Sequence, residues 1–293
     1  MSARRIALVG GSGQLGTALR EVFAERELIV PAHAEVALER GDDVARLLDE
    51  SQPDVLVNCA AFHHVDTCER EPERAFAINA LAVDRAAQRC AERGVAFVTV
   101  STDYVFDGTL QRAYREDDAP NPRTAYGASK LAGELLTRRH GTRHLIVRTS
   151  GVFGTTGTSN KGYTLIEKML RQAAAGEPIR MVADMTFSPS YAPHVARAIR
   201  DLVDLQAFGT HHVTNAGACS WYEFVRTALA KAGLAHAAIE PISYAELGTS
   251  TQRPLYSPLE NTTFAPAGIA PLPAWSDALD AFLAARAERE VLR

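Results

Sequence analysis

The stretch IALVGGSGQLG, residues 6–16, decides the fold expected of this chain. An apolar run over Ile6–Val9 is followed at once by glycines, and residues Leu15–Ala24 then read as a helix. A short strand, a glycine turn and a helix make the opening of a βαβ unit. The glycines fit G-x-G-x-x-G from Gly11 or G-x-x-G-x-x-G from Gly10, and either pattern lets a pyrophosphate approach the start of the helix.

The alternation of short apolar runs with longer amphipathic ones continues along the first half of the chain. Strands separated by helical crossovers run parallel and wind right-handed. We therefore predict an α/β fold with a doubly wound parallel sheet of the Rossmann type. The further strands are expected at Leu28–Val30, Asp54–Asn58, Ala96–Val100 and Leu145–Arg148, with helices near Asp43–Asp49, Pro72–Arg93 and Tyr126–Arg139.

This rhythm loosens after residue 150. The segment Gly151–Gly162 is rich in Gly, Ser and Thr, and prolines separate the later helices and strands. We expect a dinucleotide-binding domain over residues 1–150. Residues 151–293 are expected to form mainly a smaller substrate-binding lobe, with some segments returning to the Rossmann core.

Composition excludes several classes of protein. The chain has 293 residues, a formal charge of −4, 46% hydrophobic and 23% charged residues, which are ordinary values for a globular protein. Such a charge gives no general attraction for nucleic acid or anionic lipid. The apolar run after Arg5 is too short for a signal peptide, and no later run could span a bilayer, so we expect a cytoplasmic protein. The four cysteines are widely spaced, which favours reduced thiols.

The glycine turn is expected to bind a dinucleotide, because it follows a strand and opens a helix. A lone glycine-rich turn without function is the plainer alternative. The residues expected at the cofactor are Gly10, Gly13, Gln14, Leu15 and Gly16.

The choice between NAD(H) and NADP(H) depends on the end of the second strand. NAD-binding sites usually place an acidic residue there, about 20 positions after the glycines. Residues 30–35 read VPAHAE, so Glu35 comes late and His33 could lie near a 2′-phosphate. The choice stays open, with NADPH slightly favoured.

Tyr126 and Lys130 stand four residues apart at the start of a predicted helix, and therefore on one face of it. A nearby ammonium stabilises a phenolate and lowers the phenol pKa, which suits Tyr126 for general acid catalysis. Ser101 or Thr102, at the end of the fourth strand, could supply a second donor. Y-x-x-x-K alone is common by chance, and its position after the glycine turn and these hydroxyls is what favours catalysis.

This order of motifs resembles the extended short-chain dehydrogenase/reductase superfamily and, more narrowly, the dTDP-4-dehydrorhamnose reductase family. The resemblance spans most of the chain, and the run STDYVFDG is its most specific part. The segments that carry it are residues 10–16, 53–61, 65–69, 78–80, 101–108, 126–134, 148–150 and 219–224.

The resemblance implies a role for each matched residue. Tyr126 is the acid, Lys130 is its helper and touches the nicotinamide ribose, and Thr102 is the hydroxyl partner. At the cofactor it implies Cys59, Ala60 and Ala61 near the nicotinamide half, for which strand-end packing is the plainer alternative, and Asp42 or Asp43 near the adenine, where a helix cap is the alternative. At the substrate it implies Ser101, Asp103 and Tyr104, with His63 or His64 as a hydrogen-bond donor.

Three departures from the family fall in the presumed substrate lobe. Gly151 stands where a tryptophan is usual, residues 184–190 read DMTFSPS, and residues 253–259 read RPLYSPL. The reaction type is thus expected to be kept while the sugar or nucleotide has changed. Ala18 replaces a glutamate reported to bind magnesium in some relatives. The run HHVDTC at residues 63–68 lacks a second ligand cluster, so we predict no metal site.

Arg253 is the candidate phosphate contact of the substrate half, since a guanidinium fork matches a diphosphate. A surface salt bridge is its alternative. The predicted function is NAD(P)H-dependent reduction of the 4-keto group of a nucleotide-linked 6-deoxyhexose. Alternatives are a nucleotide-sugar epimerase or dehydrogenase, or a non-catalytic NAD(P)-binding regulatory subunit like the partner of methionine adenosyltransferase among the relatives. A homodimer is compatible with the sequence.

Overall fold

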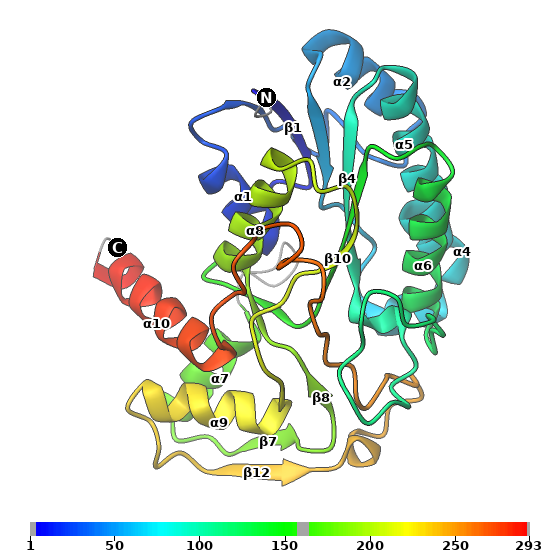
Figure 1. Ribbon diagram of the computed structural model, residues 1–293. Coiled ribbons are helices and arrows are strands. Elements are labelled where there is room, and N and C mark those ends of the chain that lie inside the picture. Colours follow the sequence, from blue (N-terminus) through cyan, green and yellow to red (C-terminus); the bar gives the residue numbers. More distant parts are fainter. Residues whose placement is uncertain (1–3, 157–163, 292–293) are drawn as a thin grey trace.

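The computed structural model describes residues 4–156 and 164–291. Its centre is a six-stranded parallel sheet in the order β10-β5-β4-β3-β1-β2 (Figure 1). The strands are β1 (Arg5–Val9), β2 (Glu27–Ile29), β3 (Val55–Asn58), β4 (Ala96–Thr102), β5 (His144–Thr149) and β10 (Gly209–His212).

Helices cover both faces of this sheet, so its central strands are buried on both sides and consist of continuous apolar runs. Leu19 of α1 and Ile199 of α8 pack with Ile6 on one face, and Leu48 of α2 packs with Leu56 on the other. The predicted α/β, doubly wound Rossmann-type fold is confirmed. The covering helices are α1 (Gln14–Val22) and α8 (Ala192–Asp204) on the first face, and α2 (Asp43–Ser51), α5 (Val83–Glu92) and α6 (Ala125–Arg138) on the second (Figure 1).

The helix expected over Pro72–Arg93 is interrupted. It runs as α4 (Pro72–Phe76), a π-helical segment η1 (Ala77–Ala82) and α5, and a short helix α3 (Val65–Arg70) precedes it. In η1, the Asn79 amide accepts the Phe62 N–H at 2.8 Å and donates to the Phe62 carbonyl at 2.9 Å. It also donates to Ser129 Oγ at 3.0 Å. The π-helical turn therefore ties the loop after β3 to α6.

A second, smaller lobe follows β5. Its core is built from Ile166 of α7, Phe224 of α9 and Phe282 of α10, with Phe153 and Phe187 from short strands. The chain returns from this lobe to the main sheet for α8 and β10 (Figure 1). The lobe elements are β6 (Val152–Phe153), α7 (Leu165–Ala174), β7 (Ile179–Val182), β8 (Thr186–Phe187), β9 (Ser190–Tyr191), β11 (Cys219–Ser220), α9 (Trp221–Lys231), β12 (Ile239–Ile242), a 3₁₀ turn η3 (Tyr244–Leu247) and α10 (Trp275–Val291).

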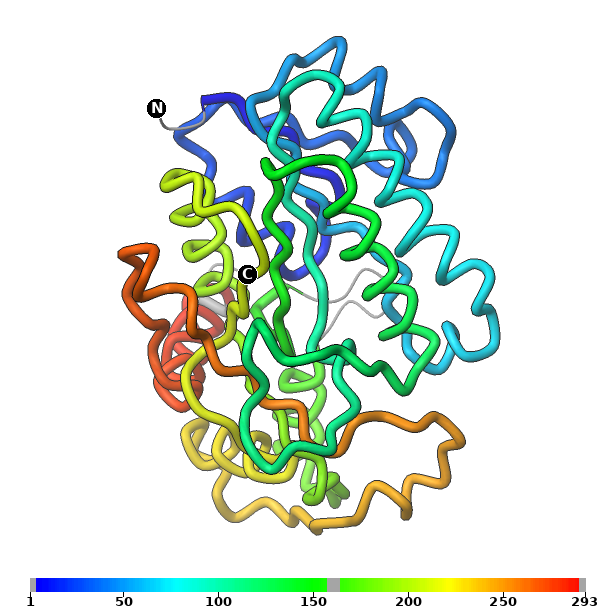
Figure 2. Tube along the Cα trace, turned by 45° about the vertical axis from the view of Figure 1, so that its right-hand side comes forward, coloured from blue at the N-terminus to red at the C-terminus, as the bar shows by residue number. Residues whose placement is uncertain are grey.

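The lobe and the core are joined near the carboxyl ends of the strands. A core loop around Tyr114 runs beside the late segment 256–260, where the Tyr114 N–H donates to the Pro258 carbonyl and the Glu260 N–H to the Tyr114 carbonyl, both at 2.8 Å (Figure 2). In the sheet, β2 lies on one side of β1 and β3 on the other, so the order of the strands reverses direction at β1. Ligands of open α/β sheets bind outside the carboxyl ends of the strands at such a reversal.

Among the helices of the described residues, none is long and apolar enough to cross a membrane.

Candidate active site

At two positions of the glycine turn, only glycine fits. Gly10 has a φ of +81°, and a Cβ there would lie 2.6 Å from the Ala60 nitrogen. A Cβ on Gly16 would collide with the Gly10 carbonyl oxygen. The turn therefore packs tightly against the loop after β3, and α1 packs tightly against the turn. Gly13, the N-cap of α1, has no side chain to cap the first N–H groups of the helix, which leaves them available to an anion.

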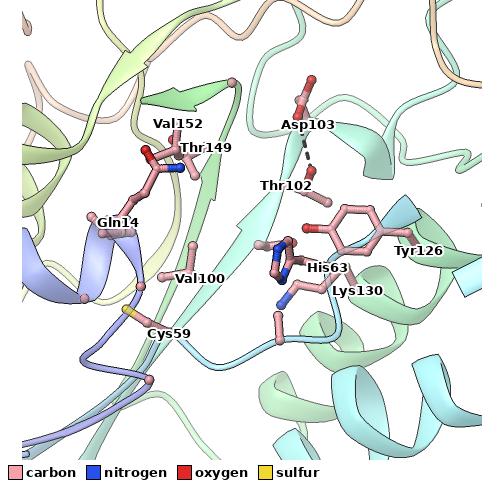
Figure 3. A pocket seen from close by; sticks show the side chains of 17 residues that line it. Gln14, Cys59, His63, Val100, Thr102, Asp103, Tyr126, Lys130, Thr149 and Val152 are labelled. Atoms are coloured by element: carbon pink, nitrogen blue, oxygen red, sulfur yellow. Dashed lines mark hydrogen bonds between the residues drawn. The ribbon is translucent and has the colours of Figure 1, made fainter. Parts of the chain in front are cut away.

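A pocket of about 340 Å³ opens in front of this turn (Figure 3). It is bounded by the glycine turn, the ends of β3, β4 and β5, and the start of α6. The predicted site residues on its wall are Gly10, Gly13, Gln14, Leu15, Gly16, Cys59, Ala61, His63, Ser101, Thr102, Asp103, Tyr126 and Lys130, and four further residues complete it: Val100, Thr149, Gly151 and Val152.

Tyr126 and Lys130 face the pocket from the first turns of α6 (Figure 3). Thr124 caps this helix, its hydroxyl accepting the Gly127 N–H at 3.0 Å. Lys130 is only 4% exposed, and burial lowers its pKa to about 8, against the charge of Glu134, which favours the ammonium form. The start of α6 therefore carries a phenol and a buried amine one turn apart.

Burial raises the pKa of Tyr126, while a hydrogen bond with Thr102 acts in the opposite direction. This differs from the expectation that Lys130 lowers the phenol pKa. The reason is that removing a phenolate from water is unfavourable, and the enclosed position of the ring makes this effect the largest. Tyr126 is accordingly a neutral phenol at pH 7, which is the protonation state that a proton donor needs.

Thr102 and Asp103 form a small buried cluster beside the phenol. The Thr102 hydroxyl donates to Asp103 Oδ1 at 3.1 Å and accepts the Tyr104 N–H at 3.2 Å. From the late loop, Ser257 Oγ donates to Asp103 Oδ2 at 2.6 Å. Burial raises the pKa of Asp103 to about 6, although the Ser257 bond favours its ionised form. Asp103 thus links the end of β4 to the lobe.

Ser101 reaches the pocket wall, but its hydroxyl is used elsewhere. It donates to Glu134 Oε1 at 2.6 Å, and the same carboxylate receives Arg148 through Nε at 2.9 Å and Nη2 at 2.8 Å. Glu134 and Arg148 are each 1% exposed. The Ser101 proton is thus engaged by a buried ion pair, and a contact of Ser101 with substrate stays a prediction. Both candidate hydroxyls donate to a carboxylate, and Thr102 is the one that acts on the Tyr126 phenol.

Tyr104 and Arg253 lie outside the pocket wall. The Tyr104 ring meets the Tyr126 ring edge-on, with centroids 6.0 Å apart. Arg253 donates through Nη2 to both oxygens of Asp66, at 2.8 and 2.9 Å, and Thr251 Oγ1 donates to Asp66 Oδ1 at 2.8 Å. The salt bridge considered as the alternative for Arg253 is present. It joins the late loop of the lobe to α3 of the core.

Asp42, Asp43 and Ala60 also stand apart from the pocket. The Asp43 carboxylate accepts the Ala37 N–H at 3.1 Å and pairs with Arg40 and Arg46, while Asp42 is an exposed partner of Arg89. The Ala60 backbone packs against Gly10 of the glycine turn. A contact of Asp42 or Asp43 with adenine stays a prediction.

Thr149 is the polar residue among the four wall residues that the sequence reasoning did not assign. It is the last residue of β5 and 6% exposed. Thr149 Oγ1 and Gln14 Oε1 are buried and have no hydrogen-bond partner among the described residues. The strand-end rule that indicated Thr102 applies equally to Thr149, so the signal was present in the sequence.

The space beside Gly151 explains one departure from the family pattern. Gly151 has a φ of +49°, and any side chain there would run into the ring of Phe187. Phe187 is 2% exposed and stacks on Trp221 with ring centroids 3.9 Å apart. The large side chain absent at position 151 is thus matched by one at position 187, which reaches the same space from β8.

Within the described part of the chain, no group of three or more His, Cys, Asp or Glu residues could hold a metal ion.

Comparison with known proteins agrees with this geometry. The family model described as the RmlD substrate binding domain matches residues 4–288. The spore coat polysaccharide biosynthesis protein SpsK of Bacillus subtilis is 36% identical over 284 residues, covering 96% of this chain and 98% of that protein. The dTDP-4-dehydrorhamnose reductase of Burkholderia thailandensis is 36% identical over 275 residues, covering 88% and 90%.

Among solved structures, the dTDP-4-dehydrorhamnose reductase of Bacillus anthracis in complex with NADP superimposes with a TM-score of 0.91 at 32% identity, covering 97% of this chain and 99% of that one. The corresponding Yersinia enterocolitica enzyme gives 0.88 at 28% identity, covering 97% and 99%. The chain therefore belongs to the RmlD family of extended short-chain dehydrogenases/reductases, which includes the dTDP-4-dehydrorhamnose reductases.

Proposed function

We propose that the protein reduces the 4-keto group of a nucleotide-linked 6-deoxyhexose with NAD(P)H, NADPH being preferred. The observation that carries this proposal is the meeting of Tyr126, Thr102 and Lys130 with the glycine turn in one pocket. A proton donor and a dinucleotide cradle at one place are what carbonyl reduction by hydride transfer requires.

The pocket fits a nicotinamide dinucleotide. The glycine turn leaves backbone room for a pyrophosphate, and the uncapped first turn of α1 offers it N–H groups. Glu35, the carboxylate considered for the ribose, accepts the Ala32 N–H at 2.8 Å and so stays with its own turn. This supports NADPH over NADH, as does the NADP in the Bacillus anthracis relative.

The cofactor, when bound, supplies the hydride to C4 of the sugar. Tyr126 donates its phenolic proton to the O4 atom as negative charge develops there, and the neutral state favoured by burial makes this proton available. The Lys130 ammonium stabilises the phenolate that results. Thr102, which lines the pocket with Tyr126 and acts on its phenol, orients the donor.

The substrate class is supported by the relatives, which include a spore coat polysaccharide biosynthesis protein and several dTDP-4-dehydrorhamnose reductases. We expect His63 and Asp103, which line the pocket, and Tyr104, whose ring meets that of Tyr126, to contact the sugar. Arg253 is the proposed contact of the diphosphate, for which it would have to exchange Asp66 for the phosphate oxygens.

The test is NADPH oxidation, followed by absorbance, with 4-keto-6-deoxyhexoses carried on dTDP, UDP, GDP and CDP. The expected result is turnover with at least one of them and none without sugar. A regulatory subunit would bind the cofactor but would not oxidise it, whichever sugar of the panel is supplied. That outcome would contradict the proposed reaction.

A further inference from the structure

Glu134 of α6 is a buried carboxylate that the proposed mechanism does not use. It accepts hydrogen bonds from Ser101 Oγ at 2.6 Å, from Arg148 Nε and Nη2 at 2.9 and 2.8 Å, and from Arg138 Nη2 at 3.2 Å. Ser101 belongs to β4 and Arg148 to β5. Glu134 and Arg148 are closed off from solvent, whereas Arg138 is partly exposed. The carboxylate is therefore held in one position between α6 and the two strands.

Glu134 also stands four residues after Lys130 in α6. Residues at this spacing lie on one face of a helix, with Cβ atoms about 5–6 Å apart, and both side chains are buried. Burial disfavours the ammonium form of Lys130 and lowers its pKa, while the negative charge of Glu134 acts in the opposite direction. The carboxylate is thus near enough to influence whether the amine carries a proton.

Other titratable groups of the pocket wall surround the same amine. They are Cys59, His63, Asp103 and Tyr126. Cys59 and Tyr126 are neutral at pH 7, because burial raises the pKa of both side chains. Asp103 is bound by two hydroxyl groups, one at the end of β4 and one in the late loop, and His63 is exposed. Glu134 differs from them in being a buried charge on the helix face that carries the amine.

We propose that Glu134 is a positioning residue, whose carboxylate stabilises the ammonium form of Lys130. Ser101 and Arg148 hold the carboxylate in place, and the Arg148 cation offsets part of its charge. Lys130 is then charged at neutral pH despite its burial, as the proposed assistance to Tyr126 requires. The inference rests on the proposed function, because it explains the charge of the residue that assists Tyr126.

The test measures the pKa of Lys130 directly, by NMR of the full chain without cofactor or sugar. The sequence has four lysines, so ¹³C labelling at their Cε atoms gives few signals, and Lys130→Met identifies the signal of Lys130. In the wild type this signal is expected to titrate at about pH 8, below the ordinary lysine pKa of about 10.4.

Glu134→Gln is expected to lower the Lys130 pKa by about one pH unit, because the negative charge is lost while the burial is kept. Arg148→Met is expected to raise it by a similar amount, because the carboxylate keeps its charge and loses the cation that offsets it. Unfolding would instead move the signal toward the ordinary lysine value in both variants, so opposite displacements separate an electrostatic role from loss of structure. The matched control is Glu92→Gln on α5, an exposed carboxylate paired with Arg89, which should leave the titration unchanged.

Removing one partner of a buried ion pair is strongly destabilising. If either single variant does not fold, the double variant Glu134→Gln/Arg148→Met decides, since it leaves neither charge unpaired. Its Lys130 pKa is expected to lie below that of the wild type, because the charge that acts on Lys130 is that of Glu134. A Lys130 pKa that does not fall in Glu134→Gln or in the double variant, or that moves in the same direction in both single variants, would overturn the proposal. The proposed reaction fails separately, since the expected displacements without turnover of any keto-sugar leave the effect of Glu134 on Lys130 intact.

Discussion

The core half and the lobe half of the candidate site use their polar side chains differently. On the core half, Gly10 and Gly16 leave room that a side chain would fill, and the first N–H groups of α1 have no side-chain cap. On the lobe half, the late loop is held to the core by Arg253, which is paired with Asp66. The cofactor side is therefore shaped in advance for its ligand, whereas on the substrate side the proposed phosphate contact, Arg253, is already paired within the protein.

The largest expected effect tests whether the core half also carries the chemistry. Tyr126→Phe removes the proton donor and keeps the ring, so kcat should fall about a thousandfold while the dissociation constant of NADPH stays unchanged. Steady-state rates and calorimetry measure the two quantities. Tyr222→Phe on α9 is the matched control and should behave as wild type. Near-normal turnover by Tyr126→Phe would show that Tyr126 is not the proton donor, and hence that the core half does not carry the chemistry in this way.

Lys130 gives the next largest effect. Its pKa is lowered to about 8 by burial, so the ammonium form predominates below that pH and is lost as the pH rises through it. The rate constant kcat/KM should therefore decline above about pH 8, and Lys130→Met should lower it about a hundredfold at pH 7. Lys130→Arg should move the decline to higher pH. A flat profile from pH 7 to 9.5 would exclude a role for the charge.

A smaller effect concerns the pair that closes the lobe half. Arg253→Gln should raise the KM for the nucleotide sugar about tenfold with little change in kcat, since a charge-assisted phosphate contact is lost. Asp66→Asn should not raise the KM, because it releases Arg253 from its competitor. Equal increases in both variants would show that the ion pair acts only as a structural link between loop and core.

The smallest effect concerns two positions of the lobe that depart from the family pattern, Gly151 and Phe187. Gly151→Ala and Phe187→Ala should each destabilise the protein, the first by collision with the Phe187 ring and the second by leaving a cavity. In the double variant the collision is relieved, so the two losses should fall short of additivity by about 1 kcal/mol. Chemical denaturation measures this coupling. Full additivity would mean that the two positions do not share space.

Much of the fold followed from local signals. Apolar runs of strand length, the glycine turn and helical spacing indicated the parallel sheet, and the rule that strand ends meet at one edge brought Thr102 and Tyr126 together. These signals are contained in neighbouring residues.

The contacts that arise between distant segments could not be predicted in this way. Ser101 lies 33 residues from Glu134 and Asp103 lies 154 from Ser257, and nothing near either residue indicates its partner. The pKa of Tyr126 was expected to fall and instead rises, because it depends on how completely other elements enclose the ring. Sequence reasoning identified most of the polar residues that line the site. It missed the hydrogen-bond partners and the burial of these residues, because both depend on distant segments.

The central claim, hydride transfer to C4 of a keto-sugar, is tested most directly with NADPH deuterated at C4 of the nicotinamide on the transferred side. The account predicts one deuterium at C4 of the product sugar for each cofactor oxidised, read by mass spectrometry and NMR. A product altered without net oxidation of the cofactor, as in epimerisation, or deuterium absent from C4, would contradict it.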